Sequence, residues 1–147
     1  MKKQASVFLM TLSLLGTLAV VSAYSLSVEN FVVNIPFSFT IGDKTFPAGR
    51  YRVEPISFSG ATLNSKVVIR STSGDKSTIV STLPIQASGI QDQSKLVFNR
   101  YGDQYFLSQV WTAGNSAGRI VRESRIEERL AKNVEERQMV SITANQR

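Results

Sequence analysis

The chain has 147 residues, a net charge of +6 at pH 7, and neither His nor Cys. This composition excludes a disulfide framework, a thiol nucleophile, a Ser-His-Asp triad and an imidazole metal site. We therefore predict no metal site and no cofactor. The basic residues are dispersed without a run of five like charges, which favours a solubilising surface over a nucleic-acid-binding patch.

Residues 1–23 have the features of a secretory signal peptide. Lys2 and Lys3 form a positive start, an apolar stretch follows, and Val21-Ser22-Ala23 offers small residues to the peptidase. The uncharged run extends to Val28, which is also long enough for an uncleaved membrane anchor, although no positive stop signal follows it. We predict an exported protein, periplasmic or extracellular, that is cleaved and then not inserted in the membrane.

Residues 24–118, the larger part of the single domain that remains, are predicted to be mainly β. Apolar side chains occupy the odd positions of a first strand over 31–41, the two-residue alternation of a half-buried strand: Phe31, Val33, Ile35, Phe37, Phe39 and Ile41. Because Pro36 cannot donate to a ladder, it marks either an edge strand or a break between two shorter strands. A turn at 46–49 leads into a strand in which Tyr51 and Val53 share one face.

Two further strands, at about 61–71 and 79–85, are separated by the turn-forming residues 72–75. The strongest hairpin signal joins 95–100 to 104–111. If Gly102 and Asp103 form the loop, Phe98 lies opposite Leu107 and Arg100 lies opposite Tyr105.

The second strand of this hairpin carries apolar residues on both faces, which indicates a central position covered on two sides. Turn signals recur every 8–12 residues or so, a spacing typical of β-sandwiches. The pattern predicts an antiparallel β-sandwich or flattened barrel of six to eight strands, with a C-terminal amphipathic α-helix.

Residues 119–147 form a charged helix and tail. Ser124-Arg125-Ile126-Glu127 is a capping box, in which the serine oxygen accepts from the third N–H and the glutamate reaches back to the cap. We predict a helix from 125 to about 138, with Ile126, Leu130 and Val134 packed against the β domain. Basic and acidic residues nearly cancel here, which disfavours a lipid surface. After Met139 the chain is polar and is expected to fray.

Candidate ligand-binding residues lie on the 99–111 hairpin, where aromatic rings stand beside polar side chains able to bond sugar hydroxyls: Asn99, Arg100, Tyr101, Tyr105, Gln109 and Trp111. The alternative is that the large aromatic residues fill the core of a central strand. The two interpretations differ in one observation. A platform requires Tyr101, Tyr105 and Trp111 to be exposed together on one flat surface.

Enzymatic chemistry has few candidates. Two converging carboxylates can hydrolyse glycosides, and the acidic residues of the β region are Glu29, Asp43, Glu54, Asp75, Asp92 and Asp103. Asp43, Asp75 and Asp103 each lie beside a glycine in a turn, where bonds to the local backbone explain the aspartate. We therefore predict that the chain is not an enzyme.

The segments 33–44, 46–51 and 96–111 resemble those of a group of short, signal-peptide-bearing proteins found in acidobacterial genomes. In that group the hairpin is likewise followed by a Gly/Asn loop and a charged helical tail, as at 113–133 here. The resemblance covers nearly all of the chain after the signal peptide and is most specific in the hairpin. It implies an exported β protein of a soil-type bacterium, and it carries no established activity.

Two classes of function follow. The first is a non-enzymatic structural or interaction module of the bacterial periplasm or cell surface, in which the C-terminal helix or an exposed strand edge meets an envelope protein or polysaccharide. The second is a carbohydrate-binding or envelope-polymer-binding module that uses the 99–111 hairpin. Neither predicts an oligomeric state.

Overall fold

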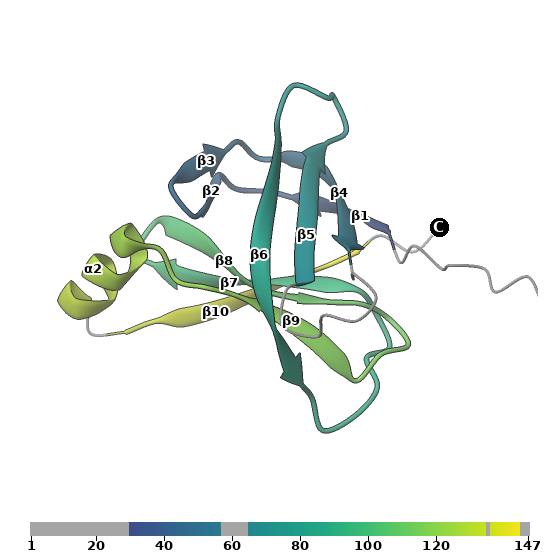
Figure 1. Cartoon of the computed structure of the whole chain (residues 1–147). Helices are drawn as coiled ribbons and strands as arrows, with labels where there is room; N and C mark the ends of the chain where they lie inside the picture. The colour runs from purple at the N-terminus through teal and green to yellow at the C-terminus, as the bar shows by residue number, and fades with distance from the viewer. Residues whose placement is uncertain (1–29, 57–64, 135, 145–147) are drawn as a thin grey trace, which may run out of the picture.

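The computed structural model describes residues 30–56, 65–134 and 136–144. The predicted signal peptide and the first residues of the strand predicted at 61–71 lie outside this range. The described chain is mainly β with one short helix near the C-terminus (Figure 1). Its elements are β1 Phe31–Ile35, β2 Phe39–Ile41, β3 Lys44–Phe46, β4 Gly49–Ile56, β5 Ser65–Ser71, β6 Ser77–Gln86, β7 Lys95–Tyr101, β8 Gln104–Trp111, β9 Ala117–Val121, α2 Arg125–Asn133 and β10 Gln138–Thr143.

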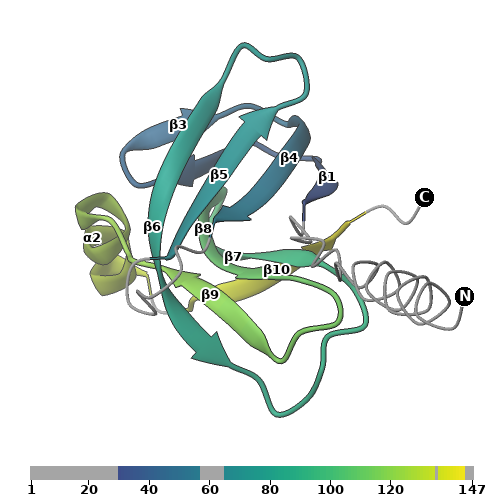
Figure 2. The same cartoon turned by 45° about the vertical axis from the view of Figure 1, so that its right-hand side comes forward.

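The ten strands of the described ranges belong to one sheet. Its path runs β1-β4-β5-β6-β9-β8, and β8 pairs along its opposite edge with β7, which in turn pairs with β10. The sheet curls, so that one limb, β4 to β6, crosses the other limb, β7, β8 and β10 (Figures 1 and 2). The two ends, β1 and β10, share no strand pairing within the described ranges, and the curl stays open.

The prediction of a mainly β fold with a C-terminal helix is confirmed, whereas two details differ. The described ranges contain ten strands instead of six to eight, because the predicted 31–41 strand is divided into β1 and β2 and because β3, β9 and β10 were not expected. The sheet is also mixed. The β2–β3 hairpin lies along β8, and its one bridge to β8, between Thr40 and Phe106, is parallel.

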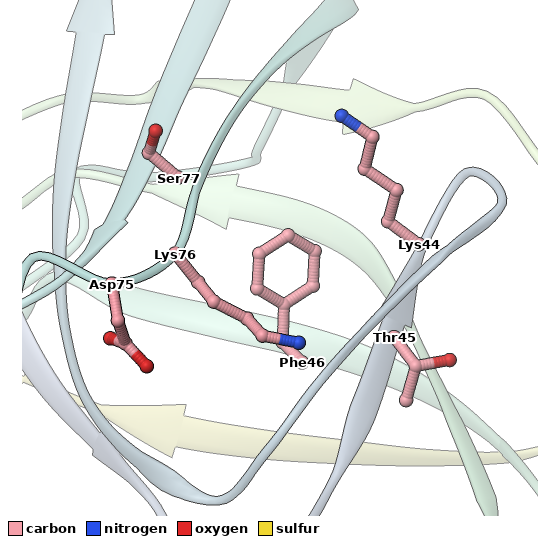
Figure 3. A pocket seen from close by; sticks show the side chains of 6 residues that line it. All are labelled: Lys44, Thr45, Phe46, Asp75, Lys76 and Ser77. Atoms are coloured by element: carbon pink, nitrogen blue, oxygen red, sulfur yellow. The ribbon is translucent and has the colours of Figure 1, made fainter.

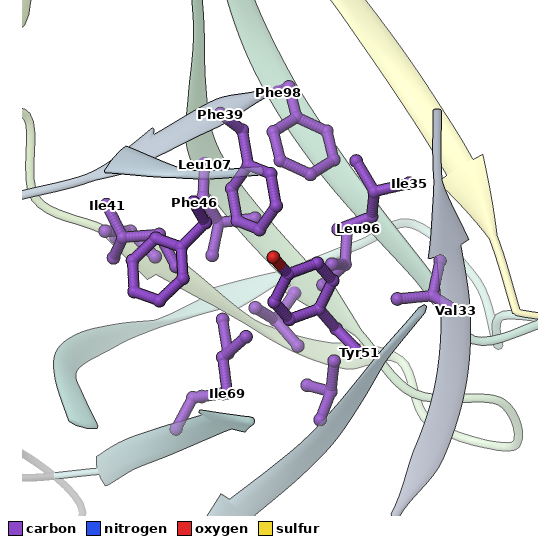
Figure 4. Packing of buried hydrophobic residues seen from close by; sticks show 14 of the residues in the cluster. Val33, Ile35, Phe39, Ile41, Phe46, Tyr51, Ile69, Leu96, Phe98 and Leu107 are labelled. Carbon is purple, nitrogen blue, oxygen red and sulfur yellow. The ribbon is translucent and has the colours of Figure 1, made fainter. Parts of the chain in front are cut away.

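The core lies between the two limbs and is filled by the predicted alternating residues. Phe31, Val33, Ile35, Phe39 and Ile41 are all buried, as are Tyr51 and Val53 of β4. Figure 4 shows the rings of Phe39, Phe46 and Tyr51 packed together, with Phe98 beside them. Burial of these side chains stands in place of disulfides as the source of stability.

Pro36 marks a break rather than an edge strand. β1 ends at Ile35 and pairs with β4, whereas β2 begins at Phe39 and pairs with β3 and β8. Between them Phe37 is only partly buried and stacks on Tyr105, with ring centroids 3.8 Å apart. A proline here costs no ladder bond, because the chain changes partners at this point.

The hairpin register is confirmed: Phe98 pairs with Leu107 and Arg100 with Tyr105. The central position of β8 is confirmed as well. It pairs with β7 on one edge and with β2 and β9 on the other, and its residues are buried on both faces. The core covers one face, and on the other side the helix α2 reaches the hairpin.

The C-terminal segment differs from the prediction. α2 ends at Asn133 and Val134 caps it in an extended conformation, so the helix is shorter than expected. Ile126 and Val134 are exposed, and the buried residue of the helix is Glu127. In place of a frayed tail, β10 pairs with β7 from Lys95 to Arg100. Among the described residues, no helix is long and apolar enough to cross a bilayer.

Candidate functional site

The six hairpin residues proposed as a ligand site are not displayed together. Asn99, Tyr101 and Trp111 are buried, whereas Arg100, Tyr105 and Gln109 are partly buried. The three aromatic rings have three separate sets of neighbours. Tyr101 lies edge-on to Phe106, with ring centroids 5.9 Å apart, whereas Tyr105 stacks on Phe37. The hairpin therefore presents no flat aromatic surface on which a sugar ring could stack.

Trp111 packs at the junction of β8 and β9. Its ring lies directly on Gly118, where any Cβ atom would clash with it. Its indole N–H donates to Gln109 Oε1 at 2.8 Å, so the polar group of the ring is satisfied from within the same strand. Trp111 and Gln109, which were both predicted to contact a ligand, are thus used in packing the sheet.

A buried polar cluster joins α2 to β7. Glu127 is only 3% exposed, and its Oε1 atom accepts a hydrogen bond of 2.7 Å from Asn99 Nδ2 and a longer one of 3.5 Å from the Tyr101 hydroxyl. The predicted cap is present in part, since the Ser124 hydroxyl accepts from the Glu127 N–H at 3.2 Å. The carboxylate, however, bonds across to the sheet instead of back to the cap.

Burial raises the pKa of the Glu127 carboxyl, against the opposing effect of the Asn99 hydrogen bond. The neighbouring Glu123 raises this pKa further, and Arg137, which lies 3.0 Å from Glu123, lowers it. Burial likewise raises the pKa of Tyr101. Because the cluster lies between helix and sheet, its polar groups hold α2 in place, and they are not directed into the cleft described next.

A second region is the gap that the sheet leaves between β3 and the first half of β6. We call this gap the seam, bounded by the edges of β3 and of Ser77–Ser81. β6 pairs with β9 only from Thr82 to Gln86, and β3 pairs only with β2 in the part of the chain that the structure describes. Both strands therefore present an unpaired edge to the seam (Figure 1).

The hydrogen bonds of β6 show to which side of the strand the N–H and C=O groups of each residue point. The Ser71 N–H donates to the Lys76 carbonyl, so in the β5–β6 ladder the bonded residues of β6 are the even ones. The Ala87 N–H donates to the Ser116 carbonyl, and the odd residues thus face the β9 side. The backbone groups of Ser77, Ile79 and Ser81 consequently point into the seam, where the described strands offer them no partner.

A cleft of about 450 Å³ opens at the end of the seam near the β5–β6 turn, a size typical of small binding sites. Its lining residues come from β3 and from the turn: Lys44, Thr45, Phe46, Asp75, Lys76 and Ser77. Phe46 is buried and forms the apolar floor, and the other lining residues are exposed. In Figure 3 the lysine side chains extend from opposite sides of Phe46.

Asp75 is held within its own turn. The hydrogen bond from the Ser73 hydroxyl is the main reason that its pKa is lowered, and a further bond from Ser71 acts in the same direction. Gly74, at φ +82°, supplies the left-handed residue that the turn requires. The carboxylate is therefore ionised and bonded to the turn, as the interpretation of this aspartate as a turn residue predicts.

Sequence reasoning did not select the seam. One available signal is the repetition of Gly-Asp-Lys at 42–44 and 74–76, which are the two turns that lie on either side of the cleft. Nothing in the order of the elements, however, shows that these turns meet, because they lie on strands that are not paired with each other. No family model, curated protein or solved structure matches the chain.

Proposed function

We propose that this chain is an exported, non-enzymatic interaction module of the bacterial periplasm or cell surface, and that it binds an extended segment of an envelope protein at the seam by strand addition. One observation carries the proposal: among the described residues, the edge of β6 from Ser77 to Ser81 has no partner strand, and it begins beside an open cleft. A peptide in extended conformation gains affinity from main-chain hydrogen bonds to such an edge and specificity from alternate side chains.

The surroundings of this edge suit a guest strand. Outward from the sheet, Ile79 is 64% exposed, a large apolar side chain at an unpaired edge. Towards the interior, Val80 is partly buried against the core and Phe46 forms the floor of the cleft. A bound strand would therefore place apolar side chains over Phe46 and Val80 at alternate positions.

Export supports the same function. The features of residues 1–23 direct the chain out of the cytoplasm, and unpaired strand edges are used there by several kinds of binding module. Natural proteins otherwise blunt an exposed edge with charge, proline or a bulge. The β6 edge has none of these between Ser77 and Ser81, which favours a binding role for it.

The test uses the protein purified from the exported fraction of its expression host and a displayed library of random peptides. We expect selected peptides to slow hydrogen exchange at the amides of Ser77, Ile79 and Ser81, because these N–H groups become bonded. Ile79→Pro, which removes one seam-facing N–H without breaking the β5 ladder, should weaken binding at least tenfold. Ile79→Thr is the matched control, since it loses the same side chain and keeps the N–H.

If Ile79→Thr weakens binding as much as Ile79→Pro does, side-chain contact and not strand addition explains the affinity. A library that yields no binder protecting these three amides would overturn the proposed function. The carbohydrate alternative has no comparable support, because Tyr101 and Trp111 are buried.

A further inference from the structure

The two Gly-Asp-Lys turns place equivalent lysines at one cleft. In each turn the lysine follows the aspartate at the point where a strand begins or is about to begin, at Lys44 for β3 and at Lys76 just before β6. Both side chains line the same cleft, one from each side of Phe46 (Figure 3). Two lysines from parts of the chain more than thirty residues apart thus line a single opening.

The charges at this opening do not balance. Its lining residues include two lysines and one aspartate, an excess of one positive charge. The aspartate, Asp75, bonds to the hydroxyl of Ser73. The ion pairs found among the described residues, Arg100 with Asp103 and Arg137 with Glu123, involve neither lysine. Both ammonium groups are therefore available to an anion that enters the cleft.

We propose that the extended segment bound at the seam is acidic, with a glutamate or aspartate side chain that binds between Lys44 and Lys76 while its apolar neighbours cover Phe46. This inference rests on the proposed function, because it names the chemistry of the partner at that same site. Thr45 and Ser77 also line this opening.

The position of the lysines also determines where along the bound segment the acidic residue must lie. They lie at the end of the seam next to the β5–β6 turn, whereas Ile79 and Ser81 continue the unpaired edge away from it. The acidic residue therefore belongs at one end of the bound segment, and the strand-forming residues occupy the rest. Charge at this end increases the rate of encounter, and the strand supplies the main-chain bonds.

The experiment compares two synthetic peptides with blocked termini, six alternating valine and threonine residues ending in two glutamates, or in two glutamines. Binding is measured by fluorescence anisotropy with the exported protein at low and high salt. We expect the glutamate peptide to bind about tenfold more tightly at low salt and to lose this advantage in the Lys44→Gln/Lys76→Gln variant. The control variant Lys95→Gln/Lys132→Gln removes the same charge away from the cleft and should keep the advantage.

The outcomes separate the two proposals. If both peptides bind equally and Ile79→Pro abolishes binding, strand addition stands and the acidic preference is overturned. If the control variant loses the preference for the glutamate peptide as fully as the cleft variant does, the overall positive charge of the protein explains the preference. The inference of a specific site is then wrong. If neither peptide binds while library-selected peptides protect the β6 amides, the acidic segment is again excluded. If no peptide of any kind binds, the proposed function itself fails.

Discussion

The β7–β8 hairpin and the seam show opposite uses of side chains. The hairpin holds the chain's tryptophan and two of its four tyrosines, and the structure uses them inside the sheet or against the helix. The seam holds small hydroxyl residues and lysines, and its backbone groups have no partner among the strands that the structure describes. A residue type rich in binding chemistry is therefore a poor guide to a binding site when it occurs on a central strand, where both faces are covered.

The largest loss of stability is expected from a substitution at the centre of the β7–β8 hairpin. Phe98 is fully buried and lies edge-on to Phe37 and Phe39, so Phe98→Ala should lower the free energy of unfolding by about 3–5 kcal/mol. Urea denaturation of the purified protein measures this loss. A cost below about 1 kcal/mol would mean that the hairpin does not anchor the core.

An intermediate effect is expected where the hairpin meets α2. Glu127→Ala removes the partner of the buried Asn99 amide and should cost about 1–3 kcal/mol. Because the pKa of Glu127 is raised in the folded protein, its contribution is present at acidic pH and is lost as the pH rises through that pKa. Relative to Glu127→Gln, the natural chain should therefore lose stability as the pH rises above about 4, the ordinary pKa range of a glutamate.

Denaturation at several pH values checks this dependence. Glu128→Gln is the control, since Glu128 is exposed on the same helix and carries the same charge. Equal changes in both variants would assign the pH dependence to the overall charge of the helix and not to the buried cluster.

The smallest effect is expected at the seam. Ile79 is exposed, so Ile79→Thr should change the free energy of unfolding by no more than about 0.5 kcal/mol. Thermal and urea denaturation of this variant, measured beside Phe98→Ala, sharpen the contrast between a residue used for folding and one free for binding. A loss close to that of Phe98→Ala would show that the β6 edge is part of the core and not a free surface.

Local patterns predicted the parts of the fold that local physics determines. The odd apolar positions of 31–41 set which face of β1 and β2 is buried, and the Gly102-Asp103 loop set the hairpin register. β10 had a weaker signal, since only Ser141 and Thr143 alternate with Val140 and Ile142, in a segment whose charged and polar flanks suggest a tail. Its strand conformation depends on β7, which lies almost forty residues earlier.

The candidate site could not be predicted from local sequence patterns. The seam exists because β6 exchanges partners along its length and because the β2–β3 hairpin joins β8 instead of closing against β6. Both depend on pairings between strands that are far apart in the sequence, and a short sequence window does not contain both partners. Glu127 was recognised as a cap, but whether a helical glutamate turns back to its own backbone or across to a buried amide depends on what lies opposite. Here that residue is Asn99.

The position of β9 has a practical consequence. Within the described ranges, its ladders to β6 and to β8 are the route by which hydrogen bonding passes from one limb of the sheet to the other. The single tryptophan, Trp111, rests on Gly118 at this joint. The tryptophan fluorescence of the protein therefore reports on this contact between β8 and β9. Its emission should move to longer wavelength when the limbs separate, so that one optical signal distinguishes opening of the whole sheet from events confined to the seam.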